Sequence, residues 1–186
     1  MPSAAFTEWQ TIRMPRLAQI DGQCAGVAAL VPPNPSLLDE CLRGYVMLLS
    51  AHFQGFCRTL YSECSQICAA TVPVPFRATV QAQFSAELQL GKQNPSLKTI
   101  RADFERFGFT LTFPAAYAPQ ITDLDHLNHW RNTAAHQRIS PPPHPIQAAL
   151  VLPDIQRWRT SCNGLATALD DIMQKELLRI LGVAPW

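Results

Sequence analysis

Residues 37–70 carry hydrophobic side chains at the spacing of one face of an α-helix, sustained for about nine turns. Ser36, followed by Asp39 and Glu40, resembles a capping box at the start of this segment, and "VPVP" (72–75) ends it. The pattern predicts one long helix. Its apolar face consists of Leu38, Leu42, Leu49, Phe53, Phe56, Cys57, Leu60, Cys64 and Ile67.

A second long helix is predicted near the end of the chain. Pro153 suits its first turn, and Gly182 is a suitable stop. The apolar positions between them fall on one face, as expected for a helix packed against a core. They are Ile155, Trp158, Cys162, Leu165, Leu169, Ile172 and Ile180.

Shorter helical segments fill the rest of the chain, and prolines separate them. We expect helices over 4–20 (interrupted by Pro15), 76–90 and 97–107, and another that begins at Pro119. The segment "FGFTLTF" (107–113) has the composition of a strand. We interpret it as a helix exit and loop, because no other segment offers a strand to pair with. The fold class is therefore all-α, a bundle of five or six helices.

The proline-rich stretch "VPPNP" (31–35) suggests a boundary within what is otherwise a single domain. Residues 1–33 are then an N-terminal helical extension, and residues 34–186 are the bundle proper.

Small residues form a row on the first long helix, opposite its apolar face. The row is Gly44, Ala51, Gly55 and Ser62. Because a glycine inside a helix costs about 1 kcal/mol relative to alanine, such a row indicates that another helix approaches closely, from the same chain or from a second copy. Two incidental glycines would give the same pattern, and the sequence leaves both interpretations open.

Composition narrows the classes of function. The chain is 47% hydrophobic and 16% charged, with a net charge of +1, which is typical of a globular protein and leaves no general basic surface for nucleic acid. Any nucleic-acid contact must be local. The low fraction of charged residues also suggests that a partner covers part of the surface. Cys57, Cys64 and Cys68 share one side of the first long helix, and no C-x-x-C pair occurs, so we expect buried thiols in a reducing compartment.

The beginning of the chain lacks the apolar core of a signal peptide, and no segment reaches the ~18 continuous apolar residues of a membrane span. We therefore expect a soluble, cytoplasmic protein without membrane contact. Glycine-rich phosphate loops and Ser/His/Asp hydrolase signatures are also missing from the sequence, which argues against kinases and esterases.

The stretch "HWRNTAAHQR" (129–138) holds the candidate chemistry. Helical spacing places His129, Asn132 and His136 on the polar side of their helix, and Asn132 can hydrogen-bond the His136 imidazole four residues later. Arg131 lies about 140° from His136 around the helix. The two converge if the helix loosens before His136, if the arginine side chain curls, or if a second subunit supplies the missing group. The opposite stripe, which we expect to face the core, is Leu124, Leu127, Trp130 and Ala134.

"LNHWRNTAAHQR" resembles the R-N-x-x-x-H signature of the HEPN superfamily, all-α domains found in prokaryotic toxins and antiviral systems. The upstream "LRGYVMLLSAHFQGFCRTLYSEC" is similar to that family's long helix, and the resemblance covers roughly residues 34–182. It implies a metal-independent endoribonuclease that needs no cofactor, works as a homodimer on RNA, and is controlled by an antitoxin or nucleotidyltransferase partner.

The resemblance assigns roles residue by residue. Arg131 and His136 match the family's catalytic pair, and Asn132 matches its polar neighbour. Many relatives have a glutamate where this chain has Gln54 ("HFQGF"). If that glutamate positions the catalytic arginine, a glutamine would hold the arginine less firmly. The basic residues nearby would add positive charge for the RNA backbone. They are His129, Arg138, Arg157 and Arg159.

Three alternatives stay open. The domain can be a catalytically inactive RNA-binding or dimerisation module, a reading that Gln54 favours. Asp123, His126 and His129 follow a spacing that a metal site could use, although each step of three residues drifts by about 60° around the helix. "PPPHP" (141–145) could be a polyproline ligand or, more simply, a loop spacer.

Overall fold

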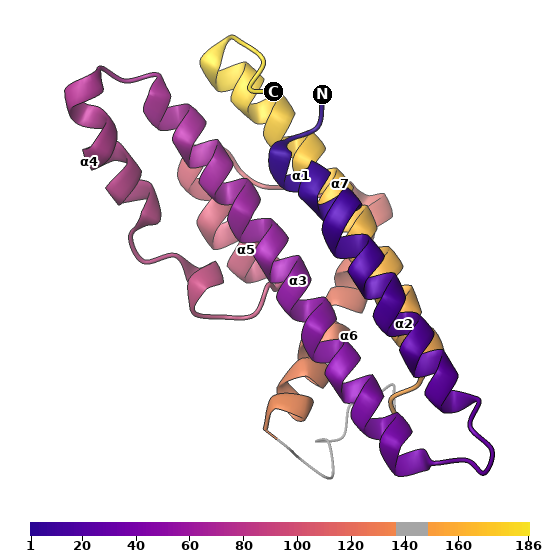
Figure 1. The fold of residues 1–186 in the computed structure, drawn as a ribbon. Coiled ribbons are helices and arrows are strands. Elements are labelled where there is room, and N and C mark those ends of the chain that lie inside the picture. Colours follow the sequence, from indigo (N-terminus) through magenta and orange to yellow (C-terminus); the bar gives the residue numbers. More distant parts are fainter. Residues whose placement is uncertain (137–148) are drawn as a thin grey trace.

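The computed structural model describes residues 1–136 and 149–186, and their regular secondary structure is helical throughout (Figure 1). This confirms the all-α prediction, and "FGFTLTF" (107–113) starts at the last residue of a 3-10 turn and continues as a loop. The helices are α1 (Ala4–Glu8), α2 (Met14–Ala28), α3 (Pro35–Ala70), α4 (Val74–Ser85), α5 (Leu97–Phe104), α6 (Ala118–Ala135) and α7 (Leu152–Leu181). A π-helical segment, η1 (Trp9–Arg13), joins α1 to α2, and the 3-10 turns are η2 (Gln89–Gly91), η3 (Glu105–Phe107) and η4 (Ala115–Tyr117).

Helix α3 is the centre of the arrangement and packs against α2, α4, α6 and α7. It is 36 residues long and α7 is 30, which confirms the prediction of two long helices. We call α1, η1 and α2 together the N-terminal rod, because they follow one another without a break and run antiparallel to α3 (Figure 1). Both chain ends lie at the same end of the molecule.

The N-terminal rod shares the core of the bundle. The Trp9 ring is fully buried and meets Phe53 edge-on at a centroid distance of 6.0 Å and Phe56 at 5.6 Å. Leu17, two turns further along the rod, is also fully buried. Since burying one large apolar side chain contributes about 1.5–3 kcal/mol, the rod adds substantially to the stability of the fold. Other large side chains at full burial include Tyr45, Leu49, Leu60, Tyr61, Leu90, Ile100, Phe104 and Trp158.

Proline and glycine mark most helix ends as expected. Pro119 and Pro153 lie in the first turns of α6 and α7, and Gly182 ends α7 in the left-handed conformation at φ 72°. The capping box at Ser36 is wrong. Asn34 caps α3 instead, with its side chain accepting a hydrogen bond from the Leu37 N–H at 3.0 Å, because Pro35 takes the first helical position.

Two helix boundaries differ from expectation. The first helical segment extends to Ala28 rather than residue 20, with Pro15 accommodated in the first turn of α2. The helix expected over 76–90 ends at Ser85, and the chain passes Glu87 at a positive φ of 55°. Asp103 supplies a reason, because its carboxylate accepts the backbone N–H groups of Gln89 and Leu90 at 2.9 and 2.7 Å and so holds them outside the helix.

The cysteines behave as predicted, as small buried side chains. Cys57, Cys64 and Cys162 are buried, and burial raises the pKa of each thiol. Cys68, half-buried beside them on α3, has its thiol pKa raised by the same cause. These thiols are therefore poor nucleophiles at neutral pH.

The row of small residues on α3 does not face a neighbouring helix along its length. Nothing lies within 4 Å of where a Cβ atom at Gly44 would be, and Ala51 and Ser62 are exposed. At Gly55 the close neighbour is a side chain, the guanidinium of Arg13. The predicted close approach thus occurs at one position only.

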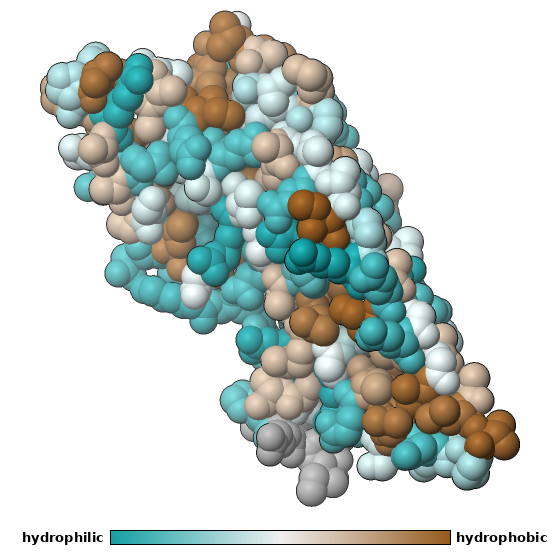
Figure 2. All heavy atoms as spheres, in the orientation of Figure 1, coloured by the Kyte–Doolittle hydropathy of each residue, from teal (hydrophilic) through white to brown (hydrophobic). Residues whose placement is uncertain are grey.

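Apolar surface gathers at the end of the molecule where α2 meets α3 (Figure 2). Leu30, Val31 and Leu37 are 43%, 93% and 42% exposed there. Across the described part of the chain, no helix combines the length and the apolar character needed to cross a membrane.

Candidate functional site at the end of α6

Arg131, Asn132 and His136, which we call the α6 site, lie at the C-terminal end of α6. The apolar stripe of this helix faces the core as predicted, with Leu124, Leu127 and Trp130 buried and Ala134 half-buried. Arg131 is half-buried, whereas Asn132 and His136 are exposed. The helix thus fixes the α6 site by its apolar side and presents the polar groups outward.

Arg131 and Asn132 are in contact. The Asn132 side-chain oxygen accepts a hydrogen bond from Nη1 of Arg131 at 3.4 Å and a shorter one from Nδ2 of Asn94 at 2.8 Å. In the described part of the chain, Arg131 forms no ion pair with a carboxylate. Its guanidinium therefore keeps most of its N–H groups available for an anionic ligand.

His136 lies just beyond the last turn of α6. It is the C-cap residue, with φ −94° and ψ 9°, and its backbone N–H donates to the carbonyl of Asn132 at 3.1 Å. The helix is regular as far as Ala135 and His136 keeps this α-helical bond, so the backbone does not loosen before His136. Of the three ways in which Arg131 and His136 could converge, a curled arginine side chain and a second subunit are the two that stay open. The side chain of Asn132 is bonded to Asn94 and Arg131 instead of to the imidazole.

Gln54 connects α3 to this end of α6 through the loop that precedes α5. Its Nε2 donates to the carbonyl oxygens of Leu90 and Gln93 at 2.6 and 2.9 Å. The next residue, Asn94, bonds Asn132. The structure thus joins Gln54 and Asn132, both predicted as site residues, by a short relay of hydrogen bonds, and it gives Gln54 a supporting role.

Two further side chains hold the same loop, and sequence reasoning missed both. Asn128 is buried on α6 and donates from Nδ2 to the carbonyl of Pro95 at 3.4 Å. Asp103 is 1% exposed and binds the start of η2. A buried carboxylate that accepts two backbone N–H groups is well satisfied, so we regard Asp103 as a positioning group for the loop that carries Asn94.

Two of the basic residues expected around the α6 site, Arg157 and Arg159, are paired with carboxylates. Arg157 binds Asp123 from Nε at 3.1 Å and Asp154 from Nη1 at 2.8 Å, and these contacts raise its pKa against the opposing effect of burial. Arg159 pairs with Asp21 at 3.4 Å. Because carboxylates already pair with these two arginines, the structure does not support a role for them in binding RNA.

His129 is half-buried, with its ring perpendicular to that of Trp130 at a centroid distance of 6.2 Å. Arg138, the remaining residue that we expected to bind substrate, lies outside the described residues.

The alternative metal site at Asp123, His126 and His129 gains no support. The carboxylate of Asp123 is buried and has both oxygens engaged, one with Arg157 and the other with the Ser161 hydroxyl at 2.6 Å. No group of three metal-binding side chains occurs within residues 1–136 and 149–186. Asp123 instead ties α6 to α7. The "PPPHP" stretch falls outside the described residues.

No protein-family model, curated protein or solved structure matches this chain.

Proposed function

We propose that this chain is a metal-independent endoribonuclease of the HEPN kind, acting on RNA as a homodimer, as a toxin or antiviral-defence effector. The observation that carries the proposal is the grouping at the end of α6. There an arginine without a carboxylate partner in the described chain touches an asparagine fixed by Asn94, and an exposed histidine follows at the helix cap. An imidazole can transfer the protons in phosphodiester cleavage, and a guanidinium can stabilise the charge that develops on the phosphate.

The proposed reaction is attack of the ribose 2′-hydroxyl on its own phosphorus. The 2′-oxygen forms a bond to phosphorus as the bond to the 5′-oxygen breaks, which gives a 2′,3′-cyclic phosphate and a 5′-hydroxyl. One imidazole takes the 2′ proton and another protonates the leaving oxygen, so His136 from two copies would suffice. The guanidinium of Arg131 stabilises the charge that develops on the phosphorane.

A dimer also fits the surface. The exposed apolar side chains of Leu30, Val31 and Leu37 lie at the same end of the molecule as the C-terminal end of α6 (Figures 1 and 2). A second copy that covers them would bring two α6 sites toward one another, and apolar surface of this kind commonly marks an interface.

A second function is favoured by a specific observation. Gln54 stands where many HEPN proteins have a glutamate, and its amide is used to hold the 90–93 loop rather than Arg131. A domain with this substitution can act as an RNA-binding or dimerisation module, controlled by an antitoxin or nucleotidyltransferase partner, without cleaving RNA itself.

The deciding experiment incubates purified protein with tRNA and maps the new ends. We expect cleavage without divalent metal, and a fall of about 10²–10⁴-fold in the His136→Ala variant while the dimer persists in light scattering. His126→Ala, on the same helix but outside the α6 site, is the matched control. Intact RNA with wild-type protein, with and without metal, would favour the binding module, and a strictly monomeric protein would exclude the composite site.

A further inference from the structure

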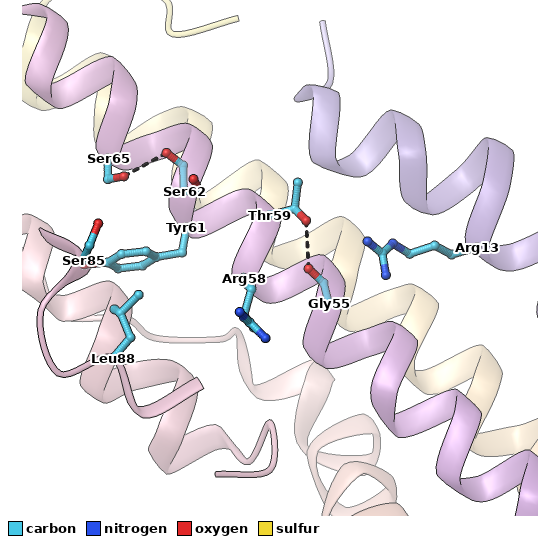
Figure 3. A pocket seen from close by; sticks show the side chains of 9 residues that line it. All are labelled: Arg13, Gly55, Arg58, Thr59, Tyr61, Ser62, Ser65, Ser85 and Leu88. Atoms are coloured by element: carbon cyan, nitrogen blue, oxygen red, sulfur yellow. Dashed lines mark hydrogen bonds between the residues drawn. The ribbon is translucent and has the colours of Figure 1, made fainter. Parts of the chain in front are cut away.

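A pocket of about 470 Å³ lies on the outer face of α3, between the N-terminal rod and the connection from α4 to η2 (Figure 3). We call it the arginine pocket, because Arg13 and Arg58 are its charged lining residues and no carboxylate lines it. Its volume falls in the range of small-molecule sites. The other lining residues are Gly55, Thr59, Tyr61, Ser62, Ser65, Ser85 and Leu88.

Arg13 reaches the pocket across Gly55. Its guanidinium lies so close to Gly55 that a Cβ atom there would displace it, and Figure 3 shows the side chain pointing from the N-terminal rod toward this glycine. Nη2 pairs with Glu8 at 2.8 Å and Nη1 approaches the His52 carbonyl at 3.5 Å, whereas Nε is buried without a hydrogen-bond partner. The glycine of the small-residue row thus makes room for a cation.

Arg58 supplies the second charge. It is exposed, projects from α3 between Arg13 and Leu88 in Figure 3, and forms no ion pair with any carboxylate in the described residues. Its five N–H donors need acceptors from solvent or from a ligand.

Two hydroxyl groups add neutral donors. The hydroxyls of Thr59, Tyr61 and Ser65 already donate to backbone carbonyls of the protein. Ser62 accepts a long hydrogen bond of 3.4 Å from Gln66, so its own O–H is available, and Ser85 is exposed at the opposite wall. Donors therefore approach the pocket from both sides.

We propose that the arginine pocket binds a phosphate group. Arg58 has no carboxylate partner among the described residues, and Arg13 shares only its Nη2 with Glu8. With two available hydroxyls and no carboxylate in the lining, they match an anion with several acceptor oxygens. Arginine is the side chain best suited to bidentate contact with phosphate. A positive potential beside the pocket is consistent with this proposal. Burial, together with the charges of Arg13 and Arg16, keeps the pKa of the neighbouring His52 below its ordinary value. The site is separate from Arg131 and His136 and does not depend on cleavage of RNA.

The phosphate can belong to the 5′ end of an RNA or to a free mononucleotide, and a titration distinguishes them. The probes are inorganic phosphate, AMP, and one short oligoribonucleotide prepared with a 5′-phosphate and with a 5′-hydroxyl. All variants carry His136→Ala, so that no probe is cleaved and a failure of the nuclease proposal leaves this test intact. Binding is followed by calorimetry and by the chemical shifts of the His52 ring, in a buffer without phosphate.

We expect Arg58→Gln to weaken binding by about tenfold or more, the usual loss for a charge-assisted hydrogen bond. Gly55→Ala should weaken it by displacing Arg13 without removing any charge. Gly44→Ala is the matched control, since it makes the same change on the same helix where nothing lies within 4 Å, and it should leave binding unchanged.

A preference for the 5′-phosphorylated RNA over its 5′-hydroxyl form identifies an RNA end as the ligand, and tighter binding of AMP identifies a mononucleotide. The proposal is overturned if none of the phosphate-bearing probes binds at millimolar concentration. It is equally overturned if Arg58→Gln and Gly55→Ala bind as well as Gly44→Ala.

Discussion

At the scale of single residues, the amide of Gln54 has a role that a carboxylate cannot fill. Its Nε2 donates to two carbonyl oxygens, those of Leu90 and Gln93, and so fixes the loop that carries Asn94. An ionised glutamate has only acceptor oxygens, which would face those carbonyls. Glutamine at this position is therefore suited to this particular loop.

We predict that Gln54→Glu destabilises the protein by about 2 kcal/mol, the cost of losing two hydrogen bonds at a half-buried site. Urea unfolding measures this change, and hydrogen exchange should quicken at residues 88–94. Gln66→Glu, an exposed change on the same helix, should alter stability by less than about 0.5 kcal/mol. If Gln54→Glu instead raises RNA cleavage at unchanged stability, the family's glutamate role applies here and our interpretation of Gln54 is wrong.

Some residues of the candidate site could be found from a local sequence pattern, and others could not. Arg131, Asn132 and His136 stand within six positions, so a short motif finds them. Asn94 contacts Asn132 across 38 positions of sequence. It lies in a polar turn before Pro95, where its composition indicates only a loop. The contact exists because α3 packs against both η2 and α6, and no local signal encodes that packing.

At the scale of elements, carboxylates of two other helices hold the start of the N-terminal rod. The two side-chain oxygens of Glu63 on α3 accept the N–H groups of Ala4 and Ala5, each at 3.0 Å. Asp170 on α7 accepts the hydroxyl of Ser3. Negative groups at a helix N-terminus satisfy otherwise unpaired N–H groups and complement the helix dipole.

Burial nevertheless disfavours the ionised form of Asp170, so we predict that the stability of the protein depends on pH. Burial raises the pKa of Asp170 above its ordinary value, although its hydrogen bonds with Ser3 lower it. Its contribution to stability is thus fully present below the unfolded-state pKa and is lost as pH rises through the higher folded-state pKa. Asp170→Asn stays neutral and should gain stability relative to wild type as pH rises from about 3 to 7.

Denaturant unfolding at several pH values checks this prediction. Asp171→Asn, the exposed neighbouring change, removes the same charge from the adjacent position and serves as the control for that loss. If the stability gap between Asp170→Asn and wild type does not change over this range, the ionised form of Asp170 is not penalised by its surroundings.

Some helix ends are set by their own residues, and others are set by residues far away in the sequence. Pro119, Pro153 and Gly182 act through their own backbone preferences, so the ends that they mark could be predicted. The end of α4 could not. There Arg106, 20 positions away, donates to the carbonyl of Ala86 at 2.7 Å, and Asp103 holds the following N–H groups. Both residues act from the α5–η3 segment.

At the scale of the whole molecule, the N-terminal rod and the long helices share one core. The sequence suggests a boundary near residue 33, because prolines there separate two helical patterns. A pattern of this kind reports where the chain turns and not how the parts pack afterwards. In the structure, Trp9 of the rod is completely buried against Phe53 and Phe56 of α3.

We therefore predict that deleting residues 1–33 prevents the remaining chain from folding cooperatively. Removing Trp9 alone, as Trp9→Ala, should cost about 3–5 kcal/mol, a large share of the 5–15 kcal/mol that stabilises a typical domain. The deletion also removes Leu17 and Cys24, which are buried in the same core. Its cost should therefore exceed the whole free energy of unfolding of the domain. Ile12→Ala, at a position 45% exposed on the same rod, should cost under about 1 kcal/mol. Thermal unfolding followed by circular dichroism tests all three proteins, and a sharp transition near the wild-type temperature in the deleted chain would show that residues 34–186 form an independent unit.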